Sequence, residues 1–354
     1  MVQTTTMGIY DPEMLAETAK VCESEKISEE VISKQVAQLQ RDWCLKQAAA
    51  GISLFPVNDI FLTDPVFEMA RALGLHNLSS WDYFSLDIKK AKWFSGDHLF
   101  YVPEIGGGMD ISFDSSALSP IPESLIDGSF EVVVSLIGPL TMLGWCIDEA
   151  SGNPFIDNWQ KFLPRYLELL LAYESRGADW IQFHEPILDR ALPADIIDLG
   201  RVIYDAVSEK TEMKSLLVFN SGHSADNIKK IMKFPVHAVH VDMIHNADNF
   251  SVFLDNDFGK IFSLGVVSAD FSNLTNLSQQ LKYVERSVNQ IGLRRTMVSM
   301  NRPFYRAPVD GINAETLDEK LNYLAVISKA MKRGRASVQS EIEANSKKLT
   351  DKQA

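Results

Sequence analysis

The chain has 354 residues, of which 46% are hydrophobic and 23% are charged, and its formal net charge at pH 7 is -13. This composition is that of an ordinary globular protein, and the acidic balance argues against a nucleic-acid partner because no basic surface can displace counterions from phosphate. No apolar run approaches twenty residues, and the N-terminus lacks the basic and apolar regions of a secretion signal, so we expect no membrane association. The cysteines Cys22, Cys44 and Cys146 are odd in number and widely spaced, which indicates a reducing compartment and a cytoplasmic location.

The first fifty residues are predicted to form a helical arm. Apolar side chains recur at helical spacing over 12–49, and Ser28 followed by two acidic residues is typical of a helix start. Beyond the arm, apolar, β-branched or aromatic runs lie at 52–57, 98–102, 132–137, 180–183, 215–219, 238–241, 261–267 and 297–300. Amphipathic helical patterns lie between most of them, at 65–73, 155–175, 194–210, 225–233, 277–291 and 314–332.

This alternation predicts an α/β fold with a parallel sheet, and eight strand-like runs favour a single closed (β/α)8 TIM barrel over a doubly wound open sheet. We therefore expect a helical arm at 1–50, the barrel at 51–332 and a charged C-terminal tail at 333–354. The stretch 106–128, rich in Gly, Pro and Ser, is predicted to be a loop that covers one mouth of the barrel. The sequence contains no Gly-rich phosphate loop and no nucleophile elbow, which argues against nucleotide-binding and serine-hydrolase functions.

The segment 180–193, WIQFHEPILDRALP, is the strongest candidate for a functional site. Its apolar strand stops at His184, Glu185 and Pro186, because proline can neither continue the strand ladder nor allow a helix at the residue before it. Polar side chains at the carboxyl ends of barrel strands carry the chemistry of this fold. We predict that His184 is a catalytic acid or base oriented by Glu185. The alternative is a helix-capping or salt-bridged pair beneath a loop.

Polar residues also follow the other predicted strands, whose carboxyl ends should meet at one mouth. The predicted substrate-binding residues are Asn58, Asp59, Glu104, Asn220, His223, Asn301, Arg302 and Arg306. The two arginines suit two-point binding of a carboxylate or phosphate. His240 and Asp242 are two apart on a strand and point to the same face, so they are candidate metal ligands together with His184 or His223. The alternative is a hydrogen-bonded histidine network inside the barrel.

Several segments carry a collinear family resemblance. They are RDWCLKQAAAGISLFPVNDIFLTDPVFEMARALG (41–74), KKAKWFSGDHLFYVPEI (89–105), GADWIQFHEPIL (177–188), FNSGHSADN (219–227), VHAVHVDMI (236–244) and FYRAPVD (304–310). Together they resemble the amino-terminal barrel of cobalamin-independent methionine synthase, from Thr4 to Asp310. The resemblance implies a (β/α)8 barrel. It also implies, for the family enzyme, methyl transfer from a methyltetrahydrofolate polyglutamate to homocysteine, whose thiol is activated by zinc in a second, carboxy-terminal barrel.

The chain departs from the family pattern where ligands would bind. Arg302 stands where a cysteine ligand would be expected, and NSGHS (220–224) has no His-x-Cys pair, so we do not expect a homocysteine-activating zinc. The family sequence Asp-Glu-Pro reads His184, Glu185 and Pro186 here, so an imidazole replaces the carboxylate that holds a substrate ammonium in the catalytic barrel. The segment 10–18 lacks basic residues that would meet a polyglutamate tail, which argues against folate as a cofactor.

Three functions follow from these patterns. The leading hypothesis is a single-barrel enzyme that acts on a small polar or anionic substrate, with methyl or alkyl transfer as the expected chemistry. The second is a partner barrel that acts in trans with a separate zinc-bearing methyltransferase barrel. The third is a non-catalytic binding protein. Formation of a homo-oligomer stays open in each case.

Overall fold

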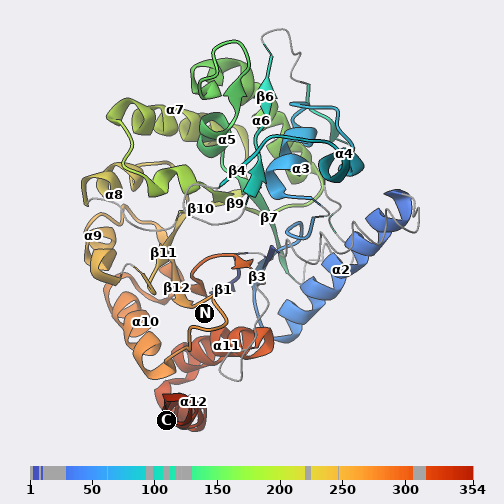
Figure 1. Cartoon of the computed structure of the whole chain (residues 1–354). Coiled ribbons are helices and arrows are strands. Elements are labelled where there is room, and N and C mark those ends of the chain that lie inside the picture. Colours follow the sequence, from blue (N-terminus) through green and yellow to red (C-terminus); the bar gives the residue numbers. More distant parts are fainter. Residues whose placement is uncertain are drawn as a thin grey trace.

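Eight parallel strands close into a barrel (Figure 1). In spatial order they are β1 (Gln3–Thr5), β13 (Thr296–Met300), β12 (Ile261–Val267), β11 (Ala238–Asp242), β10 (Lys214–Val218), β9 (Trp180–His184), β7 (Glu131–Ile137) and β3 (Leu54–Pro56). The computed structural model describes residues 3–7, 9–10, 29–61, 63–92, 99–106, 112–115, 118, 121, 130–219, 225–245, 247–305 and 316–353. The predicted (β/α)8 barrel is confirmed.

The predicted strand at 98–102 does not belong to the barrel. Within it, β5 (Leu99–Tyr101) pairs antiparallel with β4 (Lys90–Lys92), outside the closed sheet. The buried Asp64 carboxylate accepts a hydrogen bond from the Tyr101 amide at 2.9 Å and also caps the helix α3 (Pro65–Ala72). The segment therefore has the apolar composition of a barrel strand, but its backbone is bound by Asp64, the residue that caps α3.

The eighth barrel strand is β1, which lies inside the segment predicted to be a helical arm. Its residues pair with β13 on one side, and Thr5 pairs with Leu54 of β3 on the other. The sequence QTT lacks the apolar residues by which the other strands were found, although threonine is β-branched and suits a strand. The barrel therefore includes residues before position 51. The arm's helix is present as α2 (Glu29–Ala49), and residues 11–28 lie outside the described part of the chain.

Helices surround the barrel and cover its outer face (Figure 1). Besides α2 and α3, they are α4 (Ser80–Ser85), α5 (Pro139–Trp145), α6 (Trp159–Ser175), α7 (Ala194–Lys210), α8 (Ala225–Ile231), α9 (Phe250–Asp255), α10 (Leu277–Ile291), α11 (Leu317–Arg333) and α12 (Gln339–Gln353). Short strand pairs join β2 (Ile9–Tyr10) to β14 (Phe304–Tyr305) and β6 (Glu104–Ile105) to β8 (Ile147–Asp148). The predicted covering loop at 106–128 lies mostly outside the described residues. Within the described chain, no helix has the length and apolar character needed to cross a membrane.

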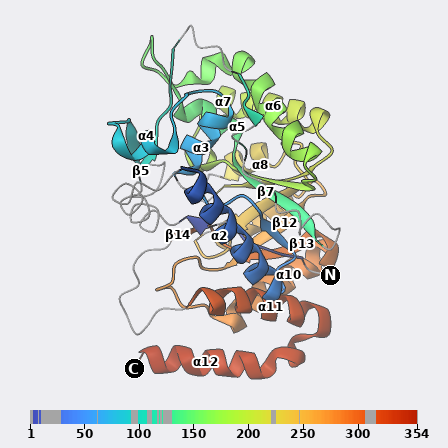
Figure 2. The same cartoon turned by 90° about the vertical axis from the view of Figure 1, so that its right-hand side faces the viewer.

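The charged tail folds as α12, which lies beside α11 at one end of the molecule (Figure 2). Asn345 of α12 accepts a hydrogen bond from the Leu277 amide at 3.1 Å and donates one to the Thr275 carbonyl at 2.9 Å. The side chain therefore satisfies backbone groups at the start of α10, where the first amides have no partner within the helix. Ile342 is buried on the same helix, and the ion pairs Lys329–Glu341 and Lys348–Glu319 join it to α11. A mainly polar helix is therefore held by an amide side chain, an apolar side chain and two ion pairs.

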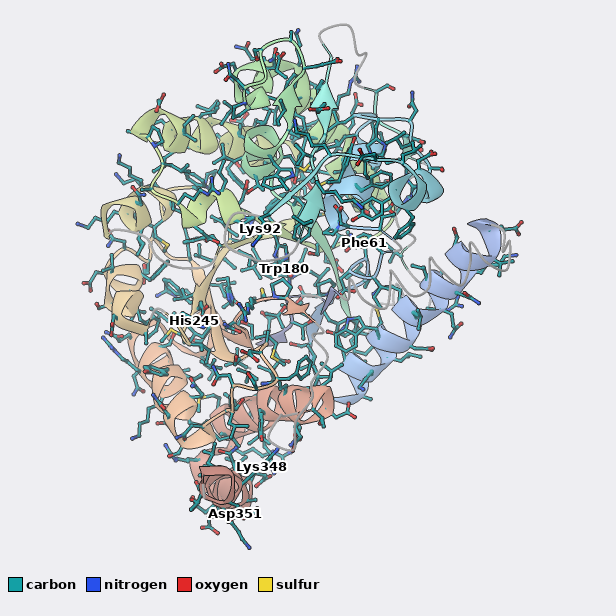
Figure 3. All side chains as sticks on the ribbon, in the orientation of Figure 1. Phe61, Lys92, Trp180, His245, Lys348 and Asp351 are labelled. Carbon is teal, nitrogen blue, oxygen red and sulfur yellow. The ribbon has the colours of Figure 1, made fainter. Side chains whose placement is uncertain are left out.

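Alternation along the strands divides the buried side chains into two sets. The set inside the barrel comprises Met7, Leu54, Val133, Trp180, Leu216, Val218, Ala238 and Met297. On β9, Trp180 belongs to this inner set and is labelled within the barrel in Figure 3, whereas Ile181 and Phe183 belong to the larger set between sheet and helices. The pleat therefore directs Gln182 and His184 inward and the following Glu185 outward.

Candidate functional site

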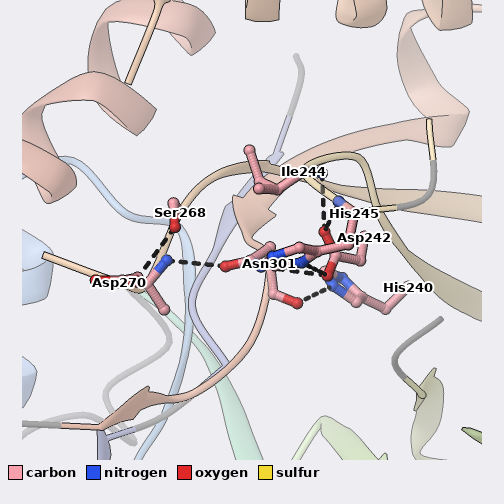
Figure 4. Close-up of polar contacts among 8 residues, drawn as sticks. His240, Asp242, Ile244, His245, Ser268, Asp270 and Asn301 are labelled. Atoms are coloured by element: carbon pink, nitrogen blue, oxygen red, sulfur yellow. Dashed lines mark hydrogen bonds and ion pairs between the residues drawn. The ribbon is translucent and has the colours of Figure 1, made fainter. Parts of the chain in front are cut away.

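A buried carboxylate at the carboxyl end of β11 organises one side of the barrel mouth (Figure 4). Asp242 is 3% exposed, and its Oδ1 accepts hydrogen bonds from the backbone amides of Ile244 at 2.8 Å and His245 at 3.1 Å. Its Oδ2 lies 2.7 Å from His245 Nδ1 and accepts from Asn301 Nδ2 at 3.2 Å. Four donors therefore surround the carboxylate, which offsets the cost of burying its charge.

Asn301, at the end of β13, connects this carboxylate to His240. Its side-chain oxygen accepts from the Ala269 amide at 2.8 Å, which orients its Nδ2 toward Asp242. Its backbone carbonyl lies 2.9 Å from His240 Nε2. Gly265 of β12 leaves the required space, since a Cβ there would lie 2.6 Å from Asn301 Cα and 2.9 Å from His240 Cε1. The side-chain amide of Asn301, which follows β13, is therefore fixed by contacts with residues at the ends of the two neighbouring strands, β11 and β12.

His240 is fully buried, and both of its ring nitrogens are engaged. A carbonyl can only accept, so Nε2 donates to Asn301. Nδ1 is left to accept from the Ser299 hydroxyl at 3.3 Å, because the Ser263 hydroxyl, also 3.3 Å from Nδ1, donates its proton to Ser299 at 3.1 Å. Burial lowers the pKa of His240 below its ordinary value. The ring is therefore a neutral bridge between strands, as in the histidine network that the sequence left open.

His245 lies three residues beyond the strand end and was not among the predicted site residues. Its side chain is 52% exposed, while its partner Asp242 is buried. The sequence pattern that could have identified it is an aspartate at a strand end with a histidine three positions later. At this spacing the carboxylate can accept hydrogen bonds from both the backbone amide and the side chain of the histidine. His245 lies beyond the end of β11, so the pattern of residues on the strand itself does not include it.

His184 points into the barrel from the end of β9. Its Nε2 is buried, and no described residue provides a hydrogen-bond partner for it. Burial, together with the nearby His240, lowers the pKa of His184 to about 3, so the ring is neutral at pH 7. A buried polar atom without a partner costs about 1–3 kcal/mol, so this nitrogen is a natural contact point for a ligand.

Glu185 does not orient His184, because adjacent residues of a strand face opposite sides of the wall. Its Oε1 accepts from the Leu140 amide at 3.0 Å and the Tyr204 hydroxyl at 2.8 Å, and its Oε2 accepts from the Thr141 amide at 2.7 Å. Gly138 makes room for the carboxylate, since a Cβ there would lie 2.1 Å from Glu185 Cδ. Burial raises the pKa of Glu185 to about 7 in spite of these donors. The residue joins β9 to α5 and α7, in line with the capping role that the sequence left open.

The two predicted substrate-binding residues that follow β3, Asn58 and Asp59, form hydrogen bonds within the fold. Asn58 donates to the Ser135 carbonyl at 3.0 Å and accepts from the Ser135 amide at 2.7 Å, so its amide extends the pairing of β3 with β7. Asp59 is buried and accepts from Gln40 Nε2 at 2.9 Å and Trp43 Nε1 at 3.0 Å, both on α2. These two residues fix a neighbouring strand and the helical arm.

Glu104 lies away from the barrel strand ends, because the run before it is not a barrel strand. It belongs to the short β6, and its exposed carboxylate lies 2.5 Å from Lys89 Nζ. Arg302 is partly buried next to Asn301. The pKa of Asp270 is lowered against the effect of its burial, mainly by two hydrogen bonds from Ser272 and more weakly by the charge of Arg302. Asn220, His223 and Arg306 lie outside the described residues.

The described residues do not fit a metal ion at this mouth. No group of three His, Cys, Asp or Glu side chains among them is arranged to hold one. His240 uses both nitrogens in hydrogen bonds, and Asp242 has four donors. Cys44 and Cys146 are buried, and burial raises the pKa of the Cys44 thiol to about 12 and that of Cys146 further, whereas a zinc ligand must be a thiolate. The predicted pair His240 and Asp242 therefore forms part of a hydrogen-bonded network in the described structure.

Comparison with known proteins agrees with this fold. Residues 82–292 match the family model of the cobalamin-independent synthase, N-terminal domain. The chain is 27% identical over 347 residues to a 5-methyltetrahydropteroyltriglutamate--homocysteine methyltransferase of Pasteurella multocida, covering 88% of this chain and 45% of that protein. It is 28% identical over 366 residues to a probable enzyme of the same name from Schizosaccharomyces pombe, covering 91% and 47%. The chain thus spans about half the length of these curated relatives.

Solved structures show the same architecture. A B12-independent methionine synthase from Shewanella sp. W3-18-1, solved in complex with selenomethionine, superposes with a TM-score of 0.68 at 15% identity and covers 97% of this chain and 99% of its own. A putative vitamin-B12 independent methionine synthase from Listeria monocytogenes gives a TM-score of 0.56 at 11% identity, with 94% and 98% coverage. With the family model matching more than half of its residues, the chain belongs to the family of the cobalamin-independent synthase N-terminal domain.

Proposed function

We propose that this protein is a single-barrel enzyme of the methionine synthase type, which transfers a methyl or alkyl group to a small polar or anionic substrate at the carboxyl-terminal mouth of the barrel. The observation that carries the proposal is the buried, inward-facing Nε2 of His184, which has no partner among the described residues. A substrate group that forms a hydrogen bond with this nitrogen would remove the cost of leaving it unpaired. The family membership and the names of the relatives support group transfer as the chemistry.

The neutral state of His184 sets the kind of group that it can hold. With its pKa at about 3, the ring carries one N–H donor and one acceptor at pH 7. A substrate carboxylate beside the ring would raise the pKa of His184 by about 1–3 units, which leaves the ring neutral at pH 7, so His184 would hold the anion by donating its N–H. The Arg302 guanidinium, at the same end of the barrel, supplies a positive charge for such a group. A small amino acid or a comparable carboxylate meets these requirements.

The match to the Shewanella protein guides the choice of substrates to test. The match covers 99% of that chain, whose structure was solved in complex with selenomethionine. The fold is what the two proteins share at 15% identity. It supports the choice of sulfur-containing amino acids as the first substrates to test.

Ligand-induced thermal shifts test the proposal. The wild type, His184→Asn and the matched control His237→Asn would be titrated with methionine, selenomethionine, homocysteine and 5-methyltetrahydropteroyltriglutamate. His237 precedes β11 at the opposite end of the barrel and is exposed, so its replacement should leave the shift unchanged. We expect at least one compound to raise the melting temperature of the wild type, with binding at least about tenfold weaker in His184→Asn, or about 1.4 kcal/mol. Equal shifts in all three proteins would contradict the role of His184.

A second candidate is a partner barrel that acts in trans with a zinc-bearing methyltransferase barrel. It is favoured by the match to the N-terminal domain of the family, and by the hydrogen bonds that already occupy His240 and Asp242. Under this hypothesis methyl transfer to homocysteine would require addition of a separately purified zinc-bearing barrel. Turnover by the purified chain alone, measured by mass spectrometry of the methylated product, would exclude it.

A further inference from the structure

The His245 imidazole is fixed by one of its two nitrogens. Its Nδ1 lies 2.7 Å from Asp242 Oδ2, and the side chain is 52% exposed. Among the described residues, no hydrogen bond involves its Nε2. The ring is therefore held at a strand end of the mouth, with one edge bound to a buried carboxylate and the other edge without a hydrogen-bond partner in the described part of the chain.

The network determines which nitrogen carries the proton. The Ala269 amide fixes the Asn301 side chain so that Nδ2 faces Asp242, and the other neighbours of that carboxylate are donors as well. A carboxylate surrounded by donors can only accept, so Nδ1 of His245 donates to it at 2.7 Å. Asn301 Nδ2 lies 3.3 Å from Nδ1 and directs its proton to the same carboxylate oxygen at 3.2 Å. The neutral ring then keeps its free electron pair on Nε2, the open edge. An imidazole held by a carboxylate in this way is the arrangement of a general base.

We propose that His245 is a catalytic base of the barrel mouth, with Asp242 as its positioning residue, for a substrate whose reacting atom must lose a proton. The proposal rests on the function proposed above and adds the group that activates the acceptor. A thiol suits it best, because a thiol is far more acidic than an alcohol and gives up its proton more readily to a nitrogen base.

The step conserves atoms and charge. The S–H bond of the acceptor breaks and its proton passes to Nε2 of His245, while the electron pair left on sulfur forms a new S–C bond to the methyl carbon of a methyl donor. The bond between that carbon and the donor's leaving atom breaks, and its electron pair stays on the leaving atom. That atom takes the proton from Nε2, so the imidazole returns to its starting state and the net change is exchange of methyl for hydrogen.

His184 and His245 are placed to act on the two ends of one molecule. His184 ends β9, and His245 follows β11, with only β10 between the two strands. At about 4.8 Å per strand, the two strand ends are ~10 Å apart. A small extended substrate bound at His184 can therefore present its reacting atom to His245, without the two histidines contacting each other.

The tautomer of His245 tests the geometry without a substrate. In a nitrogen-15 NMR spectrum at a pH where both rings are neutral, we expect His245 to be protonated on Nδ1. His237 is the internal control with the opposite tautomer, because its Nδ1 accepts from the Ser215 amide at 3.1 Å. In Asp242→Asn the side-chain oxygen would stay with the two backbone amides, so its nitrogen would face His245 and force the proton to Nε2. An unchanged tautomer in that variant, or protonation at Nε2 in the wild type, would overturn the assignment.

Reaction with diethyl pyrocarbonate and turnover complete the test. We expect Nε2 of His245 to be modified at least about tenfold faster in the wild type than in Asp242→Asn, and similar rates would count against an open basic edge. With homocysteine and 5-methyltetrahydropteroyltriglutamate, His245→Gln should lower kcat about 100-fold or more and change KM less than about twofold. His237→Gln should leave both unchanged.

These outcomes separate the two proposals. Turnover by the wild type and equally by His245→Gln would refute the base assignment and leave the proposed function standing. If the wild type neither binds nor turns over any compound of the panel, the proposed function fails, and the catalytic role of His245 fails with it, whatever its tautomer.

Discussion

Glu185→Gln should make the stability of the protein less sensitive to rising pH. Burial raises the pKa of Glu185 to about 7, although hydrogen bonds from Thr141, Tyr204 and Leu140 lower it. The unfolded carboxyl titrates near its ordinary value of 4.5, so the folded state holds the proton more tightly. The stability contributed by this group is full below about pH 4.5 and is lost as the pH rises through about 7.

The size of the effect follows from the two pKa values. The difference between about 7 and 4.5, at roughly 1.4 kcal/mol per pH unit, gives about 3 kcal/mol in total, most of which falls between pH 5 and pH 8. Glutamine does not titrate, so the free energy of unfolding of Glu185→Gln relative to the wild type should rise by about 2–3 kcal/mol over that interval. The offset at pH 5 reflects the one hydrogen bond that glutamine cannot accept.

Urea unfolding at the two pH values measures this difference, with fluorescence and circular dichroism followed together to test two-state behaviour. Glu209→Gln, on the exposed face of α7, is the matched control and should show a constant difference from the wild type. A constant difference in Glu185→Gln as well would refute the reasoning, because it would mean that the donors around the carboxylate outweigh its burial.

Two further predictions concern the inner face of the mouth. Gly265→Ala should lower the free energy of unfolding by about 2–3 kcal/mol, because its Cβ would lie 2.6 Å from the Asn301 backbone. Gly106→Ala, whose Cβ would meet only the flexible end of Glu149 at 2.8 Å, should cost less than about 1 kcal/mol, and equal losses in urea would contradict the steric argument. His184→Gln should change the pH dependence in the opposite sense to Glu185→Gln. Burial and the nearby His240 lower the pKa of His184 to about 3, so the wild type loses about 2 kcal/mol from this group between pH 7.5 and pH 5, and the variant should not. Parallel stability curves for the two proteins over that range would show that His184 is not held neutral.

The barrel could be predicted from the sequence because its strands are apolar and separated by helices. The two strand errors have one cause, which is the use of apolar character as the signal for a strand. β1 is polar but pairs with two neighbours, whereas β5 is apolar but is held by the Asp64 cap of α3. Strand pairing depends on which backbone groups find partners, and composition alone does not report this.

The candidate site was predictable only as a region. Polar residues at the strand ends are present as expected, but most of them have structural partners. Asn58 continues a strand ladder, Asp59 binds the arm, and Glu185 faces the helices. The sequence shows that a polar side chain stands at a strand end. It does not show whether its hydrogen bonds are already used within the fold, and that decides whether the side chain is available to a substrate.

Whether a strand-end residue faces the inside of the barrel or the surrounding helices helps to decide whether its hydrogen bonds are used within the fold. His184 and Glu185 are adjacent in the chain, and burial makes both more neutral, yet one nitrogen of His184 lacks a described partner and both oxygens of Glu185 have donors. Inside the barrel, Asn301 ties His240 and Asp242 into a fixed network, so neither can move to meet a ligand without breaking it. His245 has the same fixed support, but it lies in the turn beyond the strand, where one edge of its ring remains open. The proposed base is therefore anchored by the strand ends through Asp242 without being part of a strand itself.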